Sequence, residues 1–315
     1  MAELMVRDGT WTFDHEAVRI VPGHERGVHK LRRDLGEFTV PLIAIASIAY
    51  EPARKGGRLR LRLRDGADPL LQVTGGGLPD EANPYQVAVD AARADVAEYF
   101  VDAVRQALLL EQIPEGPADR YLLPGPAVPL SAAGVDGLAS FDGERVHLEW
   151  RWNTSETKRN QGPRDFALAD LAAVEWRAAA GLESGYLRFR THGATDRIAP
   201  EHDPHAIELW GFKKESGTTA LLAAAVAARL PHPSAGPGKA LTAGTPARPA
   251  SPALPAAPAP ALAPAPASGA APADDHDALL RRLRELGELR REGVLTEEEF
   301  TATKAAVLQR FHTTG

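Results

Sequence analysis

The residues of this chain best suited to binding chemistry are basic side chains on and just before one predicted strand. They are Arg54, Lys55, Arg58, Arg60, Arg62 and Arg64. A strand places every second side chain on the same surface, about 6.6 Å apart, and the arginine fork binds phosphate or carboxylate through paired hydrogen bonds. The row could bind a lipid headgroup, nucleic acid or an acidic protein. It could equally be a solvated face whose arginines pair with acids on neighbouring strands.

A second candidate surface combines aromatic and basic residues near the end of the folded region. It consists of Trp210, Phe212, Lys213 and Lys214, with Gly211 interrupting the strand pattern. Exposed aromatic residues beside cations are typical of protein interfaces. For the other tryptophans of this region, Trp150, Trp152 and Trp176, core packing of a small sheet is the simpler explanation.

Catalytic and metal-binding patterns are missing or incomplete. The chain has no cysteine, which excludes thiolate nucleophiles and cysteine-based metal sites. The His202-Asp203-Pro204-His205 segment lacks a third ligand, Ser155-Glu156-Thr157-Lys158 lacks the companion elements of acyl enzymes, and Gly75-Gly76-Gly77 lacks the Lys-Ser/Thr of a phosphate loop. We therefore predict no catalytic residue, no metal site and no cofactor.

Four sequence blocks occur twice in the same order, which indicates an internal duplication. Residues 8–18 return as residues 136–146, a spacing of 128 (8 to 136). Three further pairs of blocks follow: residues 42–50 with 168–176, 57–61 with 185–189, and 83–89 with 203–209. The sequence thus predicts two copies of one domain.

Within each copy, short alternating segments predict strands and the last segment predicts a helix. Leu59, Leu61 and Leu63 alternate with arginines, as in a half-buried strand. Asp95 is the expected N-cap of the first helix, and an alanine-rich helix is expected near residues 220–230. We predict an α+β fold with two pleckstrin-homology-like domains, residues 1–112 and 113–230, each a curved antiparallel sheet with a C-terminal helix. A flatter α+β sandwich has the same elements.

After the two copies, the composition changes twice. Residues 231–273 are mainly Ala and Pro, which predicts a disordered, partly extended linker. Residues 274–315 predict a helical hairpin with a capping box at Thr296 and Glu299. Two short helices bury too little surface to fold alone, so a partner or self-association is expected. The partner face consists of Leu279, Leu283, Leu286, Leu289, Phe300, Val307, Leu308 and Phe311.

Two resemblances support this organisation. The hairpin, with Leu283-Arg284-Glu285-Leu286 and residues 293–300, resembles the bacterial short C-terminal (SHOCT) domain. The duplicated region, with residues 8–14, 56–61 and 209–214, resembles the bacterial family called domain of unknown function 4429. These resemblances imply the architecture and no activity.

Charge and hydrophobicity restrict the remaining possibilities. The net charge of -6 and the pI near 6.0 argue against a nucleic-acid partner. The N-terminus lacks the apolar core of a secretory signal, and no run of about 18 apolar residues is present, so we expect a cytoplasmic protein. The predicted function is a non-enzymatic adaptor with a protein partner. The alternatives are peripheral binding to anionic lipid and a cryptic enzyme.

Overall fold

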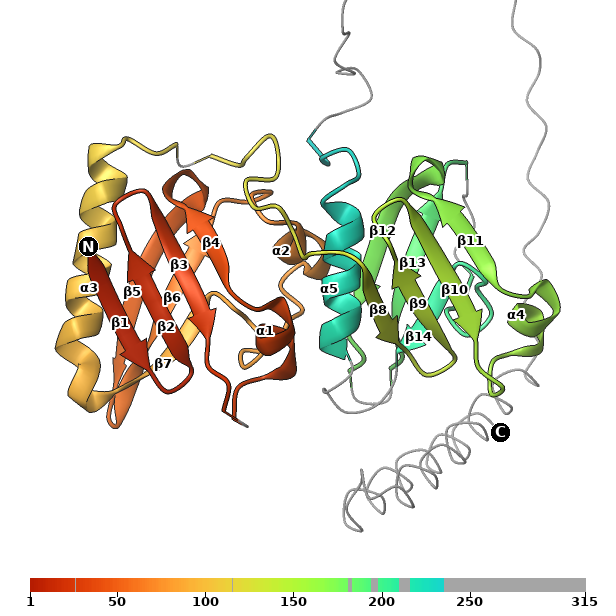
Figure 1. Cartoon of the computed structure of the whole chain (residues 1–315), viewed down its shortest axis with the longest axis horizontal. Coiled ribbons are helices and arrows are strands. Elements are labelled where there is room, and N and C mark those ends of the chain that lie inside the picture. The colour runs from red at the N-terminus through yellow and green to blue at the C-terminus, as the bar shows by residue number, and fades with distance from the viewer. Residues whose placement is uncertain (26, 115, 181–182, 194–197, 210–215, 235–315) are drawn as a thin grey trace, which may run out of the picture. The chain divides into compact units, whose positions relative to one another are not determined.

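Two similar sets of strands and helices follow one another along the chain. The computed structural model describes residues 1–234 apart from residues 26, 115, 181–182, 194–197 and 210–215 (Figure 1). The predicted linker, beyond its first four residues, and the predicted hairpin lie outside the described residues. The candidate interface Trp210, Phe212, Lys213 and Lys214 also lies outside them.

The first copy contains two antiparallel sheets and a long C-terminal helix. The four-stranded sheet has the order β1 (Ala2–Val6), β2 (Gly9–Phe13), β3 (Ala17–Pro22) and β4 (Phe38–Pro41). The three-stranded sheet has the order β5 (Ile45–Ala53), β6 (Gly56–Leu63) and β7 (Gln86–Asp90). The helical elements are α1 (Lys30–Leu35), η1 (Leu42–Ala44), α2 (Pro69–Thr74), η2 (Ala91–Arg93) and α3 (Ala94–Leu110).

The second copy repeats this order with fewer short helices among its described residues. Its four-stranded sheet consists of β8 (Leu130–Ala133), β9 (Gly137–Phe141), β10 (Arg145–Trp150) and β11 (Arg164–Ala167). Its three-stranded sheet consists of β12 (Leu171–Arg177), β13 (Gly185–Thr191) and β14 (Ala206–Leu209). The helical elements are α4 (Glu156–Gln161), η3 (Leu168–Asp170) and α5 (Ser216–Ala227). The predicted α+β class is confirmed.

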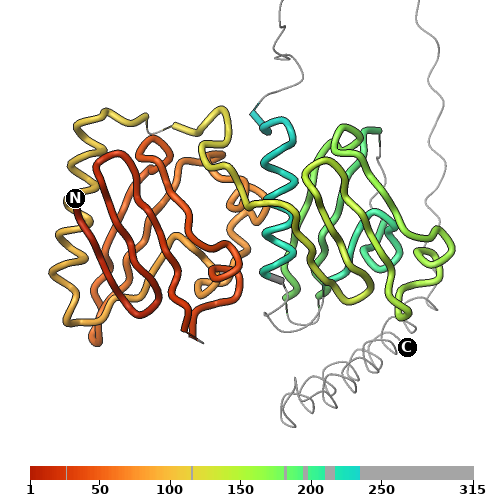
Figure 2. The backbone as a smooth tube through the Cα atoms, in the orientation of Figure 1, coloured from red at the N-terminus to blue at the C-terminus, as the bar shows by residue number. Residues whose placement is uncertain are grey.

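Alternation along the strands determines which side chains form the core of the first copy. On β2, Trp11 and Phe13 are fully buried, and Phe100 of α3 meets both rings edge-on, at centroid distances of 6.4 and 6.5 Å. On β6, the leucines point inward and the arginines outward. The helix therefore closes the core that the two sheets leave open, as Figure 2 shows for α3 at the edge of the first copy.

The same turn connects the second and third strands of both copies. The Asp14 carboxylate accepts the N–H groups of Glu16 and Ala17 at 3.0 and 2.9 Å, and Asp142 accepts those of Glu144 and Arg145 at 2.8 and 2.7 Å. These backbone hydrogen bonds lower the pKa of both carboxyl groups. Each aspartate therefore stabilises the turn of a β-hairpin, between β2 and β3 or between β9 and β10.

The helices differ from the sequence predictions in three respects. Helix α3 begins at Ala94, directly after η2, and no side chain caps it, so Asp95 lies in the first turn and is not the N-cap. Helix α5 covers Ser216–Ala227 and so begins four residues before the expected start. The short helices α1, α2 and α4 were not predicted, because six residues are too few to show a helical period.

Helix α5 joins the two copies. It contacts β8 and β12 of its own copy and α1 and α2 of the first copy, and its residues from Ala220 to Ala227 are all buried. Leu31, Leu70 and Ala82 of the first copy belong to the apolar cluster around α5. Residues 1–239 accordingly form one compact unit. No helix in the described part of the chain is both long and apolar enough to span a membrane.

Candidate anion-binding site

The predicted arginine row lies on the outer face of β6. Arg58, Arg60 and Arg62 stand opposite Glu51, Ala49 and Ser47 of β5. On the other side, β7 pairs with β6 only as far as Arg60. Arg62 therefore lies on a part of β6 that extends beyond β7.

The arginines at the start of this row are neutralised by nearby acids. Arg58 Nη1 lies 2.5 Å from Asp80 Oδ2. Arg60 lies 3.5 Å from a Glu51 oxygen and 3.9 Å from Asp80. The hydrogen bond from Arg58, followed by that from Gln86, lowers the pKa of Asp80. For Arg58 and Arg60 the solvated, ion-paired interpretation is the better one.

Arg64 has a structural role. Its guanidinium donates to the carbonyl oxygens of Gly116, Ile43 and Pro117 at 2.8, 3.1 and 3.2 Å. These bonds attach the chain that follows α3 to η1, so Arg64 does not bind a ligand with the other members of the row.

Arg62 is the arginine of the row available for a ligand. It is exposed, and among the described residues no carboxylate oxygen lies within 4.0 Å of its guanidinium nitrogens. It lines a cavity of about 590 Å³ beside α2. The cavity is lined by residues of β6 and α2, of the segment between them, and of the segment that leads into β7. They include Arg60, Arg62, Arg64, Asp65, Asp68, Gln72, Asn83, Tyr85 and Gln86. Arg54 and Lys55 form the turn between β5 and β6 and do not line it.

The second copy carries arginines at the same places, which were not predicted. Arg188 and Arg190 of β13 take the places of Arg60 and Arg62, since Arg188 pairs with Glu175 of β12 as Arg60 pairs with Ala49 of β5. Both copies therefore carry arginines on the outer face of the middle strand of the three-stranded sheet.

Acids neutralise the arginines of the second copy. Arg188 Nε donates to Asp203 Oδ2 at 2.7 Å, and Arg188 lies 3.8 Å from Glu175. Arg190 lies 3.1 Å from Glu175. Asp203 also accepts the N–H of His205 at 2.9 Å, so this acid both fixes its own turn and pairs with Arg188.

Both acids are replaced by neutral residues in the first copy. Ala49 stands where the second copy has Glu175. Asn83 stands where it has Asp203, because Asn83 Oδ1 accepts the N–H of Tyr85 at 2.9 Å just as Asp203 accepts that of His205. This bond leaves the Asn83 amide NH₂, a donor, at the position of the Asp203 oxygen that binds arginine. These two differences, Ala49 for Glu175 and Asn83 for Asp203, are visible when the sequences of the two copies are aligned.

One buried acid stabilises the wall of the cavity. Asp68 caps α2 by accepting the N–H groups of Leu70 and Leu71, each at 3.1 Å, and it accepts the Tyr85 hydroxyl at 2.8 Å. Burial raises the pKa of Asp68 despite these hydrogen bonds. Asp68 is 4% exposed and holds α2 beside β7. Among the described residues that line the cavity, the donors we assign to a ligand are therefore the Arg62 guanidinium and the Asn83 amide.

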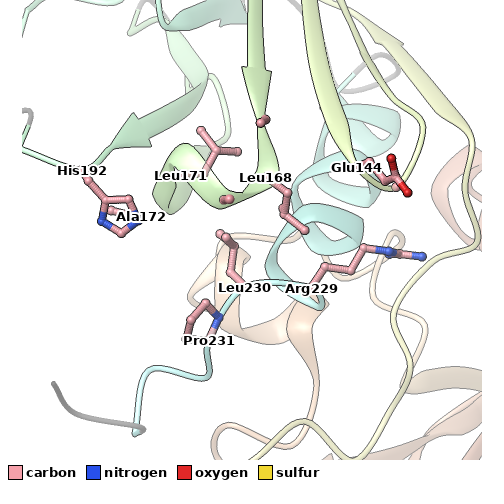
Figure 3. A pocket seen from close by; sticks show the side chains of 11 residues that line it. Glu144, Leu168, Leu171, Ala172, His192, Arg229, Leu230 and Pro231 are labelled. Carbon is pink, nitrogen blue, oxygen red and sulfur yellow. The ribbon is translucent and has the colours of Figure 1, made fainter. Parts of the chain in front are cut away.

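A second cavity, of about 500 Å³, lies at the end of α5 in the second copy (Figure 3). Its wall is mainly aliphatic and is formed by Gly143, Glu144, Ala167, Leu168, Ala169, Leu171, Ala172, His192, Arg229, Leu230 and Pro231. This cavity could not be inferred from sequence patterns, because its wall combines residues of four separate segments.

The remaining sequence candidates have structural contacts. Trp150 donates its indole N–H to Gly162 O at 2.7 Å, and Trp176 donates to Thr219 at 3.0 Å. Trp152 is 76% exposed, so the expectation that it packs in the core is wrong for this tryptophan. Within the described residues, no group of three or more His, Cys, Asp or Glu side chains could hold a metal ion.

The Ser-x-x-Lys segment belongs to a buried ion pair. Ser155 caps α4, and Lys158, which is completely buried, pairs with Asp136 and donates to Ala206 O at 2.8 Å. Arg32 and Asp8 are the counterparts in the first copy, 3.9 Å apart.

Comparison with known proteins agrees with the duplication. No curated protein matches the chain. The family profile described as domain of unknown function (DUF4429) matches residues 11–105 and again residues 139–227, together more than half of the chain. Each match begins within the second strand of its copy, β2 or β9, and extends into the C-terminal helix, α3 or α5. The protein is thus a member of the DUF4429 family with two tandem copies of the domain.

Proposed function

We propose that the protein is a non-enzymatic adaptor whose first copy holds a negatively charged group of a partner protein in the cavity beside Arg62. The observation that carries this proposal is the loss of two acids. Glu175 and Asp203 neutralise the arginines of the second copy, and Ala49 and Asn83 replace them in the first. The charge of Arg62 is left available to a ligand.

The shape and charge of the site favour a protein ligand over a membrane surface. Binding to an anionic membrane needs several free cations at one surface, whereas Arg58, Arg60 and Arg64 are committed to contacts within the first copy. The cavity is concave and has room for a single charged side chain or a phosphorylated one. Peripheral lipid binding through the row including Arg54 and Lys55 is the alternative.

The fold assigned to each copy in this proposal is pleckstrin-homology-like. Support comes from the succession of a four-stranded sheet, a three-stranded sheet and a C-terminal helix over the core. The chain is placed in the cytoplasm, and residues 274–315 act as a SHOCT-like hairpin that adds a second contact with a partner or with another copy of the chain.

The test transfers the acids of the second copy into the first. Ala49→Glu with Asn83→Asp should preserve the fold, because both new residue types occur at the same positions of the second copy, and the introduced carboxylate could still accept the Tyr85 N–H. We expect binding of a phosphoserine-containing peptide to weaken at least about tenfold, as expected for one charge-assisted hydrogen bond of about 1.5–3 kcal/mol. Fluorescence anisotropy with the full-length protein measures this affinity.

The control is the opposite exchange. Glu175→Ala with Asp203→Asn should create anion binding at Arg188 and Arg190 of the second copy. Glutamate-rich peptides and vesicles of phosphatidylcholine with phosphatidylglycerol are measured in parallel. Binding to vesicles but to neither peptide would establish the lipid alternative, and equal peptide binding by the wild type and the Ala49→Glu, Asn83→Asp variant would refute the proposed site.

A further inference from the structure

We propose that Arg164 and His205 form an acid-sensitive contact, which holds the turn before β14 against β11 and releases it when His205 takes up a proton. Arg164 begins β11, an edge strand of the four-stranded sheet, and His205 directly precedes β14 of the three-stranded sheet (Figure 1). Arg164 Nη2 and His205 Nε2 are 3.1 Å apart. The inference is independent of the anion-binding cavity, because neither residue lines it.

The donors and acceptors of this contact determine the protonation state of His205. A guanidinium group has only N–H donors and keeps its charge throughout the pH range in which proteins are folded. The hydrogen bond from Arg164 therefore requires a His205 Nε2 that carries no proton. Protonation gives the imidazole a second N–H and a positive charge. Two cations without an acceptor would then face each other, so the contact is lost.

Packing around the His205 ring also favours its neutral form. The ring meets Phe166 edge-on at a centroid distance of 5.0 Å, and the guanidinium carbon of Arg164 lies 5.8 Å from the centroid of the same phenyl ring. Burial lowers the pKa of His205, Asp203 raises it, and Arg164 lowers it. Arg164 and His205 thus lie together on one aromatic side chain, which joins the two sheets at this point.

Few charged or titratable groups lie on the described elements that pack against His205. They are Arg164 of β11, Arg188 of β13, and Asp203 and His202 of its own turn. Arg188 is neutralised by Asp203 at 2.7 Å. Arg164, in contrast, has no carboxylate oxygen within 4.0 Å among the described residues. A proton on His205 therefore meets the uncompensated charge of Arg164.

The first copy joins the same two elements with uncharged rings. Tyr85 takes the place of His205, as the hydrogen bonds of their backbone N–H groups show. Phe38 takes the place of Arg164, as the pairing of β4 with β3 and of β11 with β10 shows. The Phe38 and Tyr85 rings meet edge-on at a centroid distance of 5.7 Å. Burial raises the pKa of Tyr85 well above 10, so this ring stays neutral where a histidine titrates.

Acid should weaken the contact in the second copy. Because burial lowers the pKa of His205 in the folded protein, the unfolded chain takes up this proton at a higher pH. The stabilisation from neutral His205 is complete above about pH 6.5, the pKa of an unperturbed histidine, and is lost as the pH falls. His147 has the opposite effect, because its hydrogen bond with Asp165 raises its pKa. Only a variant at His205 separates the two.

Transfer of the first copy's pair into the second tests the inference in the full-length protein. Arg164→Phe with His205→Tyr removes the titrating contact, whereas His147 and all other titrating groups remain. Amide hydrogen exchange, corrected for the pH dependence of exchange in an unstructured chain, measures the opening of residues 198–209. Between about pH 7.5 and about pH 5.5, opening should rise more than about twofold in the wild type and stay constant in the variant. Residues 83–89 of the first copy should behave identically in both proteins.

An NMR titration of His205, assigned with His205→Gln, keeps the inference testable should the double variant not fold. Arg164→Met removes a charge that lowers the pKa of His205, so the titration midpoint should move to higher pH. Arg145→Met, at an exposed position of β10, is the matched control and should leave the midpoint unchanged. An unmoved midpoint in Arg164→Met would overturn the inference. The same acid-induced opening in wild type and double variant, or pH-independent opening in the wild type, would also overturn it.

Discussion

At the scale of single residues, the two copies differ most in how charges are neutralised. Arg188 and Arg190 have acids at 2.7 and 3.1 Å, whereas Arg62 has none within 4.0 Å in the described part of the chain. The same copy that neutralises its outer arginines also carries the more deeply buried ion pair, Lys158 with Asp136. Divergence after duplication thus changed charge pairs while the strand order stayed constant.

Replacement of Lys158 by methionine should be strongly destabilising. The substitution leaves the Asp136 carboxylate, whose side chain is 2% exposed, buried without its cation. Removing one partner of such a pair costs about 3–5 kcal/mol. Urea denaturation followed by tryptophan fluorescence measures the loss. Arg32→Met is the matched control, and it should cost less because Asp8 is 31% exposed and 3.9 Å from the guanidinium. A larger loss for Arg32→Met would contradict this explanation.

At the scale of elements, α3 and α5 have the same place in their copies but different surroundings. The face of α3 that points away from the core carries Asp95, Glu98 and Asp102, all exposed. The corresponding side of α5 is apolar and packs on α1 and α2. Of these two helices, only α5 therefore serves as an interface between the copies.

A larger side chain at Gly217 should separate the copies. A Cβ atom at this position would lie 2.9 Å from the Leu31 Cβ of α1, so Gly217→Leu overpacks the contact between α5 and the first copy, at a cost of about 1–3 kcal/mol. In differential scanning calorimetry we expect one transition for the wild type and two for the variant. Asp95→Leu, on the exposed start of α3, should retain the single transition. A single unshifted transition for Gly217→Leu would contradict the role of α5.

The strands were predictable from the sequence and the contacts between elements were not. Alternation of Leu59, Leu61 and Leu63 with arginines identified β6 and its buried face. The start of α3 was misplaced because Asp95 has the residue type of an N-cap but lies in the first helical turn. The burial of α5 on all sides could not be inferred, since an apolar helix does not reveal which of its faces contacts a second domain.

The candidate site was predictable only in part. The arginine row was identified correctly as an outward-facing set, yet the ion pairs of Arg58 and Arg60 depend on the register between β5 and β6 and on the loop that brings Asp80 close. The difference between Asn83 and Asp203 was visible in the aligned copies. That this difference removes an arginine partner could not be predicted, because only the folded structure brings Arg188 next to Asp203.

At the scale of the whole molecule, the two copies of the domain together form one compact unit. The proposed adaptor thus has a joined pair of domains and a terminal segment. We propose that the domains present the Arg62 cavity and that the hairpin predicted for residues 274–315 governs assembly.

Removal of the hairpin should change the assembly state without unfolding the pair of domains. If the hairpin self-associates, light scattering of the full-length protein should give the mass of a multimer. If it binds another protein, the full-length protein should be monomeric and should capture that partner in affinity purification. A version ending at Ala273 should be monomeric and capture nothing through the hairpin, since its leucine face is missing. Circular dichroism checks that the domains remain folded. Identical monomer masses for both versions, together with identical sets of captured proteins, would disprove a role of the hairpin in assembly.

The buried surroundings of α5 also constrain the evolution of the family. A helix with apolar residues on all sides is stable in water only while the preceding copy covers it. A descendant that lost its first copy would expose this surface and aggregate, whereas loss of the second copy would uncover Leu31 and Leu70. The duplication is therefore difficult to reverse, and relatives with a single domain should carry a final helix with a charged outer face, as in α3.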